Sequence, residues 1–273
     1  MSSYASAVGR PSPFVLAALI FLILPAGSNA QENEEHRFSV SLGLFVTDRN
    51  SDTQVDSAGG PNGTDVNLEA DLGLDTSDSV FRVDGYFRFS KKHRLDFSVF
   101  DLSRSASQPI QRDIQWNDTL FPVDTTVDAT FNLAIYKAAY TWGFLQRENG
   151  YLGLTAGLYV ADISNTLSGP VLGERERAGI TAPLPVIGLR GEYHFSDRWT
   201  FRASGELFAL EYGDYDGSLY DIYAGLDYQI IDHVAVGVGF NSVKMNLGVT
   251  KQDLTGNLDW RYDGGLVFFK FDF

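Results

Sequence analysis

Charged side chains recur at every second position in several segments of the chain, with apolar residues between them. In a β-strand such residues share one face, so each row of charges points to the same side. Rows of this kind suit either the lining of a solute pathway or a network of ion pairs that fills a narrow interior. The candidates that we single out are Arg82, Asp84, Arg88, Asp96, Arg190, Glu192, Arg202, Glu206, Asp221, Asp227 and Lys270.

The four histidines are the candidates for a general base, which must lie within hydrogen-bond reach of the nucleophile that it activates. They are His36 before the first alternating segment, His93 and His233 just after short turns, and His194 just before one. All four are therefore expected at the same end of the strands. A site built from carboxylates alone stays open but shows no motif, so the sequence identifies no catalytic residue, cofactor or metal ligand.

Residues 48–78 are strongly acidic, with a single arginine, Arg49. The acidic residues are Asp48, Asp52, Asp56, Asp65, Glu69, Asp71, Asp75 and Asp78. Carboxylates on a loop suit calcium, which takes six to eight oxygen ligands. Residues 59–65 are similar to one glycine–aspartate calcium repeat, but such repeats act in tandem and this one occurs once. We favour a solvated surface loop, and calcium binding stays open.

Alternation of apolar and polar residues predicts strands from residue 37 to the end of the chain. Short connections near 90–92, 146–149, 196–197 and 231–232 alternate with long polar stretches near 48–78, 104–123, 164–182, 211–217 and 246–257. Four short turns and two termini on one side predict ten antiparallel strands in an up-and-down barrel. The expected strands span residues 37–48, 79–90, 93–103, 124–145, 150–163, 183–195, 198–211, 217–229, 233–246 and 257–273.

Two features leave this count open. Residues 66–74 and 110–116 are each able to form another strand, so twelve strands are the main alternative, and eight are also possible. In residues 131–144 the apolar positions change from odd to even numbers, and we expect a β-bulge near Ala134. Neither an internal repeat nor a linker is evident, so residues 31–273 are predicted to form one domain.

The first 30 residues have the pattern of a secretory signal peptide. Arg10 precedes an uncharged apolar run at residues 14–25, and small residues lead to Ala30. The run is too short for a membrane-spanning helix, which needs about 20 apolar residues. We expect cleavage between Ala30 and Gln31.

The composition of the chain excludes several classes of function. Its net charge is −14, which argues against nucleic acid as a partner, because phosphates demand a basic surface. Cysteine is absent, so disulfides, thiolate metal sites and cysteine nucleophiles are excluded. The 27 Gly, 20 Phe and 13 Tyr are typical of many strands with aromatic girdles.

The last residues place Phe269, Phe271 and Phe273 on one face of the final strand. With the signal peptide and the alternation of short and long connections, this ending resembles the small bacterial outer-membrane β-barrel proteins, over residues 37–273. The resemblance implies that the three phenylalanines form the signal read by the barrel-assembly machinery. It also implies location in the cell outer membrane and contact with its lipid and lipopolysaccharide.

The resemblance marks a class of fold and leaves the activity open. We expect a structural or surface-binding barrel with a charged, mostly filled lumen, because ten strands enclose far less space than the 16 strands of porins. A narrow channel for small solutes is the first alternative and an outer-leaflet lipid-modifying enzyme the second. The histidines, expected at the periplasmic end, disfavour the enzyme. The oligomeric state stays open.

Overall fold

A computed structural model describes residues 37–56, 62–169, 173–212, 215–250 and 255–273. The predicted signal peptide, its cleavage point between Ala30 and Gln31, and His36 lie outside the described residues. The same is true of residues 59–61 in the calcium-like segment at 59–65. Among the described residues, no helix is long and apolar enough to cross a membrane.

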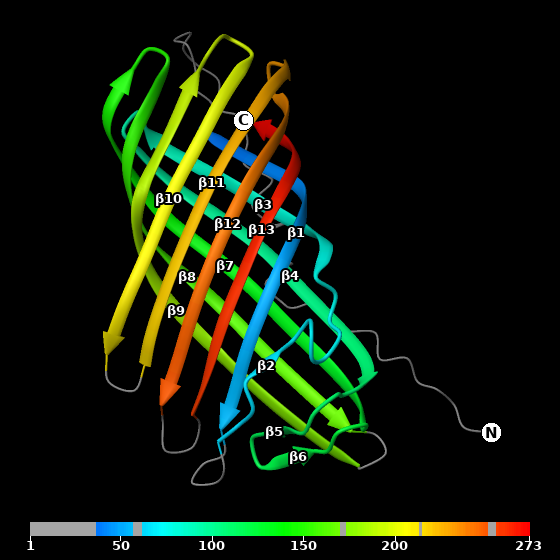
Figure 1. Ribbon diagram of the computed structural model, residues 1–273. Coiled ribbons are helices and arrows are strands. Elements are labelled where there is room, and N and C mark those ends of the chain that lie inside the picture. The colour runs from blue at the N-terminus through cyan, green and yellow to red at the C-terminus, as the bar shows by residue number, and fades with distance from the viewer. Residues whose placement is uncertain (1–36, 57–61, 170–172, 213–214, 251–254) are drawn as a thin grey trace, which may run out of the picture. The chain divides into compact units, whose positions relative to one another are not determined.

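Within the described residues, ten long antiparallel strands form a closed sheet in which each strand pairs with its neighbours in the chain (Figure 1). They are β1 (Phe38–Asp56), β3 (Ser77–Ser90), β4 (His93–Pro109), β7 (Thr126–Arg147), β8 (Gly150–Gly169), β9 (Glu174–His194), β10 (Trp199–Tyr212), β11 (Tyr215–Ile231), β12 (Val234–Thr250) and β13 (Thr255–Asp272). The last strand closes the barrel on the first, from Ser39 opposite Asp272 to Asp56 opposite Thr255. The predicted ten-stranded up-and-down barrel is confirmed.

The two segments that could have raised the count to twelve form short strands outside the barrel wall. β2 (Val66–Asn67) pairs with only two residues of β1. β5 (Ile114–Trp116) and β6 (Thr119–Phe121) form a separate hairpin.

Several stretches expected as long loops are strand instead. β1 continues to Asp56, β4 to Pro109 and β8 to Gly169, and β9 begins at Glu174. These stretches carry polar residues because their outward faces meet water, and the sequence pattern there resembles that of a loop.

The expected β-bulge near Ala134 is wrong. Ala134 pairs in regular register with Asp101 on one side and Asp162 on the other, and the irregularity in β7 lies between Gly143 and Leu145. Odd-numbered residues of β7 face inward both above and below Ala134. The apolar residues move from odd-numbered to even-numbered positions because the environment of each face changes along the strand. The alternation of inward and outward side chains continues without interruption.

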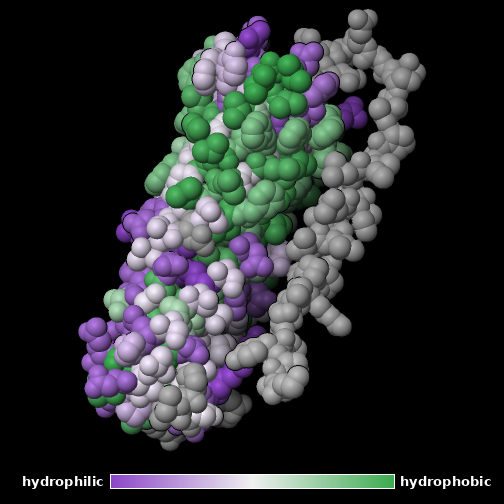
Figure 2. All heavy atoms as spheres, turned by 90° about the vertical axis from the view of Figure 1, so that its right-hand side faces the viewer, coloured by the Kyte–Doolittle hydropathy of each residue, from purple (hydrophilic) through white to green (hydrophobic). Residues whose placement is uncertain are grey.

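Exposed apolar side chains form a belt around the end of the barrel that carries the short turns (Figure 2). On β1 the outward residues Leu44 and Val46 are more than half exposed, and the next outward residues are Asp48 and Asn50. A tilted strand of roughly nine residues covers the apolar band of outer-membrane barrels, which is about 25 Å high. Since β7 alone has 22 residues, about half of its length protrudes beyond the belt.

Aromatic side chains line the edge of this belt beside the short turns. They are Trp142, Phe144, Tyr193, Phe195 and Trp199, whose exposed fractions lie between 43% and 62%. Amphipathic rings prefer the boundary between hydrocarbon and water. The belt therefore has the aromatic rim of a membrane-spanning surface.

Inside the protruding half, an apolar core fills most of the lumen and also encloses buried polar side chains such as Arg49 and Arg104. The buried apolar inward residues include Phe100, Leu102, Phe131, Leu133, Ile135, Ile163, Leu167, Leu247, Leu258 and Trp260. Two segments between strands, residues 62–76 and 110–125, add their own apolar side chains to this core, and we call them the mouth plug. Among their members Val66, Ile114, Trp116 and Phe121 have no exposed surface. The mouth plug thus fills much of the described part of the mouth and leaves a cavity of about 70 Å³ beside it, lined by residues that include Val55, Ile163 and Leu258.

Polar contacts hold the mouth plug to the strands. The Arg104 guanidinium of β4 lies 2.5 Å from Glu69, 3.0 Å from the Ser51 hydroxyl and 3.1 Å from the Asp75 carbonyl oxygen. At the other segment, the Thr119 hydroxyl donates to Glu176 of β9 at 2.7 Å.

The wall is discontinuous between β9 and β10 above the belt. The ladder between these strands ends where Ile187 faces Leu207, whereas β9 stays paired with β8 as far as Glu174. Phe195 N donates to Trp199 O, so the amides of odd-numbered β9 residues point toward β10. Pro183 and Pro185 are odd-numbered and have no N–H to donate. The two prolines therefore end the β9–β10 ladder.

Candidate functional site

The structure places every charged residue that the alternation singled out on an inward face of the membrane-spanning half. Arg82, Asp84 and Arg88 come from β3, Asp96 from β4, Arg190 and Glu192 from β9, Arg202 and Glu206 from β10, Asp221 and Asp227 from β11, and Lys270 from β13. Strand alternation puts them there because the outward residues between them are apolar and form the belt.

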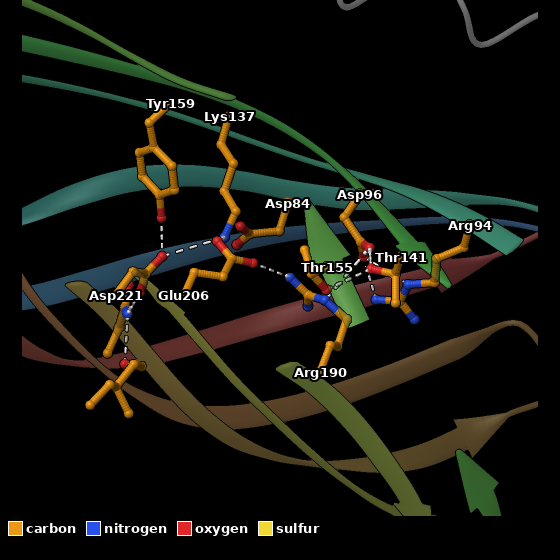
Figure 3. Close-up of polar contacts among 12 residues, drawn as sticks. Asp84, Arg94, Asp96, Lys137, Thr141, Thr155, Tyr159, Arg190, Glu206 and Asp221 are labelled. Atoms are coloured by element: carbon orange, nitrogen blue, oxygen red, sulfur yellow. Dashed lines mark hydrogen bonds and ion pairs between the residues drawn. The ribbon is translucent and has the colours of Figure 1, made fainter. Parts of the chain in front are cut away.

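One lysine and two carboxylates meet at the centre of the lumen (Figure 3). Lys137 from β7 forms an ion pair with Glu206, and its Nζ lies 3.4 Å from Asp221 Oδ2. The Tyr159 hydroxyl donates to the same carboxylate oxygen, and Asn241 Nδ2 donates to Asp221 Oδ1 at 2.5 Å. All five residues are buried. Both carboxylates therefore have a cation or hydrogen-bond donors in place.

Arg190 joins this group to a second one nearer the short turns (Figure 3). Its Nη2 lies 3.2 Å from Glu206 Oε1 and its Nε lies 3.6 Å from Asp96 Oδ2. Asp96 also pairs with Arg94 and accepts a hydrogen bond from the Thr141 hydroxyl at 2.9 Å. One guanidinium thus bridges carboxylates on two different strands.

A third group lies closest to the short turns. Arg202 pairs with Asp227, and Lys270 Nζ lies 2.7 Å from Asp272 and 4.0 Å from Asp227. Glu192 lies 3.5 Å from Arg94, which connects this end of the lumen to the second group.

Arg82 spans the lumen in another direction. Its Nε lies 2.9 Å from Asp84, and its Nη1 donates to Asn241 Oδ1 at 2.6 Å. Because Arg82 belongs to β3 and Asn241 to β12, this bond crosses the interior between strands that are not neighbours in the barrel.

The formal charges of this network balance. The seven cations Arg82, Arg88, Arg94, Lys137, Arg190, Arg202 and Lys270 face the seven carboxylates Asp84, Asp96, Glu192, Glu206, Asp221, Asp227 and Asp272. A cavity of about 80 Å³ lies among them, which is room for roughly five water molecules at about 15 Å³ each. The arrangement neutralises the interior and fills most of it.

Three members of the network were not singled out by the sequence, namely Arg94, Lys137 and Asp272. Arg94 and Asp272 lie two residues from Asp96 and Lys270, so the alternation itself could have found them. Lys137 was obscured because the apparent change of phase near Ala134 left its face unassigned.

The described histidines lie at the end with the short turns. His93 is the first residue of β4, His233 directly precedes β12, and His194 is the last residue of β9. The His93 ring contacts the Tyr140 hydroxyl, and His194 Nδ1 lies 2.9 Å from the Thr200 hydroxyl. None of these three reaches the protruding half.

The acidic segment at 48–78 is divided between β1 and the mouth plug. Its carboxylates have local roles, such as Asp56, which accepts hydrogen bonds from Gln54 and from the Gly63 amide. Asp71 accepts from Arg112 at 2.6 Å, and this hydrogen bond raises the pKa of the arginine. Within the described residues, no group of three or more histidine or acidic side chains is arranged to hold a metal ion.

The terminal phenylalanines face outward at the closure of the barrel. Phe269 and Phe273 are more than half exposed, while Phe268 between the outward positions is buried in the lumen. Phe273 N donates to Phe38 O at 2.8 Å, and Phe38 N donates to Phe273 O at 3.1 Å. The final residue therefore completes the ladder that joins the last strand to the first.

No protein-family model and no curated protein matches the chain. Among solved structures, the outer membrane protease OmpT from Escherichia coli is similar with a TM-score of 0.57 and 12% identity, covering 90% of this chain and 99% of that one. The toluene transporter TbuX from Ralstonia pickettii has a TM-score of 0.38 and 8% identity, covering 88% and 90%. Ail from Yersinia pestis has a TM-score of 0.35 and 10% identity, covering 84% and 99%. The similarity to OmpT shows that the fold is that of a small outer-membrane β-barrel.

Proposed function

We propose that the protein is a non-conducting barrel of the outer membrane whose protruding half presents a rigid, closed surface to ligands outside the cell. The observation that carries this proposal is that two different fillings occupy the lumen in series. A neutral network of ion pairs fills the belt half, and the apolar core with the mouth plug fills the protruding half.

The first filling resists solutes because its charges already have partners. A solute that passes Lys137, Glu206 and Arg190 would have to separate buried ion pairs. Removing one partner of such a pair costs about 3–5 kcal/mol. The second filling resists them because Trp116 and Phe121 are packed without exposed surface, and opening it would expose that apolar area to water.

The protruding half supports a role at the outer surface. Strands that only anchored the protein would need about 9–11 residues each, yet β8 has 20 and β9 has 21. The extra length holds a second core, which makes the protruding half a stable platform.

The similarity to a protease does not extend to a histidine-dependent site in the part of the chain that the structure describes. Its described histidines lie at the opposite end from the protruding half, beyond hydrogen-bond reach of any group there. We therefore favour surface binding over hydrolysis.

Planar-bilayer recording of the purified full-length protein tests the proposal, with a 16-stranded porin as the conducting control. We expect insertion without steady open-channel current. Because the proposal depends on a filled lumen, a reproducible unitary conductance from the wild-type protein would refute it and favour the narrow channel.

A further inference from the structure

On the outward side of the protruding half, β4, β7, β8 and β9 form a continuous surface in which six of eight side chains are serine, threonine or asparagine. The cross-strand register sets them in rows. We name as the hydroxyl face the two rows Ser103, Asn132, Ser164, Gly179 and Ser105, Thr130, Thr166, Arg177. All eight residues are exposed or half-buried. In the first row the Ser103 hydroxyl donates to Asn132 at 2.6 Å, and Asn132 donates to the Ser164 hydroxyl at 3.3 Å.

This composition is not general to the outer surface at that height. On β12, β13 and β1 the corresponding outward rows are Lys244, Arg261, Asn50 and Asn246, Asp259, Asp52. Four of those six residues are charged, against one of the eight on the hydroxyl face. One side of the barrel thus carries paired charges, and the other carries neutral groups that both donate and accept hydrogen bonds.

The hydroxyl face lies at a defined height above the apolar belt. The last apolar row on the same strands is Val99, Tyr136, Val160 and Pro183, and the hydroxyl rows begin four residues further along each strand. With a rise of about 3.4 Å per residue and a tilt near 40°, the two rows lie roughly 10–15 Å above the belt. The headgroup region of a bilayer is only about 5–8 Å thick on each side. The face therefore stands beyond the phosphates of the leaflet.

The row between the belt and the hydroxyl face is Asp101, Ala134, Asp162 and Thr181. Its two carboxylates disfavour direct contact with the phosphate groups expected at that level. The chemistry of this side of the barrel thus changes from apolar to acidic to neutral hydroxyl with increasing height.

We propose that the hydroxyl face binds the saccharide portion of the lipopolysaccharide molecules that surround the barrel. This inference rests on the proposed function, which places the barrel in the outer membrane. Sugars present donors and acceptors on rigid rings, and serine, threonine and asparagine match them with groups that do both. Their short side chains also lose less rotamer entropy on binding than long charged ones do. Arg177, at the edge of the face, supplies a cation for acidic or phosphorylated sugars.

The test measures binding of core oligosaccharide, released from rough lipopolysaccharide by mild acid, to the full-length protein in phospholipid nanodiscs. The variant S105A/T130A/T166A removes the hydroxyls of one row and leaves every inward residue intact. We expect its dissociation constant to rise at least tenfold, equivalent to about 1.4 kcal/mol. Heat-modifiable gel mobility verifies that each variant is folded.

The matched control is S242A/N246A/Q54A, which removes three neutral polar groups from the outward face of β12 and β1. We expect its affinity to stay within twofold of the wild type. Equal losses in both variants, or no wild-type binding at millimolar oligosaccharide, would overturn the inference. Equal affinity for a dextran oligosaccharide would overturn the assignment to lipopolysaccharide. Bilayer conductance is independent of these outcomes, so failure of the sealed lumen and failure of the hydroxyl face are distinguishable.

Discussion

Replacing Arg104 by methionine is expected to release the mouth plug from the barrel. The Arg104 and Glu69 side chains are 2% and 6% exposed, and their atoms lie 2.5 Å apart. Methionine keeps the apolar stem against Phe131, over whose ring the guanidinium now lies at 4.9 Å. The change leaves the Glu69 carboxylate buried, with the Ser51 amide at 2.9 Å as its remaining donor.

The expected size of the effect follows from this burial. Breaking a buried ion pair by removing one partner costs about 3–5 kcal/mol. Arg112 provides a matched control, because it also ties the same segment, through Asp71, but its side chain is 49% exposed. An exposed pair contributes about 0–1 kcal/mol, so R112A is expected to have a small effect.

Two measurements check the prediction in lipid vesicles. Denaturant unfolding, followed by tryptophan fluorescence, gives the free energy of unfolding, and limited proteolysis reports cleavage within residues 62–76. We expect R104M to lower the free energy of unfolding by several kcal/mol. If the segment detaches alone, cleavage within it should instead rise at least a hundredfold, as a loss of about 3 kcal/mol implies. R112A should change cleavage less than tenfold.

A second variant separates electrostatics from packing. Glu69→Gln in the R104M background removes the unpaired charge and keeps an acceptor for the Ser51 amide. We expect the double variant to recover most of the loss. Equal effects of R104M and R112A would refute the reasoning, and so would a double variant no better than R104M.

Two further predictions concern the barrel wall. Deletion of Phe273 removes the paired hydrogen bonds with Phe38 and should lower the amount of barrel inserted in the outer membrane several-fold. The control is Phe89→Ala, which removes another outward aromatic side chain and should insert normally. Normal insertion of the deletion variant would disprove an assembly role for Phe273. Replacing Pro183 and Pro185 by threonine restores two amides that face β10. Hydrogen exchange at the Ala209 amide, which lies opposite residue 185 when the register of Ile187 and Leu207 is continued, should then slow at least tenfold, and unchanged exchange would show that the prolines do not end the ladder.

The sequence predicted the barrel because each strand carries its alternation wherever it faces lipid. Phe81 and Phe87 alternate with Arg82 and Arg88, and the pattern leaves one assignment of faces. The short turns were equally clear, since each interrupts the alternation for only two to four residues. The ten strands and their order followed from these two signals.

The sequence did not predict the upper ends of the strands. Ser103, Ser105 and Ser107 on the outward face of β4 look like loop residues, and only the register with β7 shows that they lie in a sheet. Lys137 was missed for a related reason, because its neighbours are apolar inward on one side of it and outward on the other. Side-chain partners such as Asn241 for Arg82 depend on closure of the barrel, which no local pattern contains.

The reversal of pattern along each strand also determines what stabilises each half of the barrel. Lipid is as apolar as a protein core, so burying apolar groups does little to hold the belt half together, and hydrogen-bonded ladders and paired charges must do so. In the protruding half water surrounds the wall, and burial of Phe131 or Trp260 contributes in the usual way. On β7 the outward change from Tyr136 to Asn132 lies beside the inward change from Lys137 to Ile135. The outward and inward patterns change at the same height because one change of surroundings, from lipid to water, causes both. The same substitution at an inward position therefore acts through different forces in the two halves.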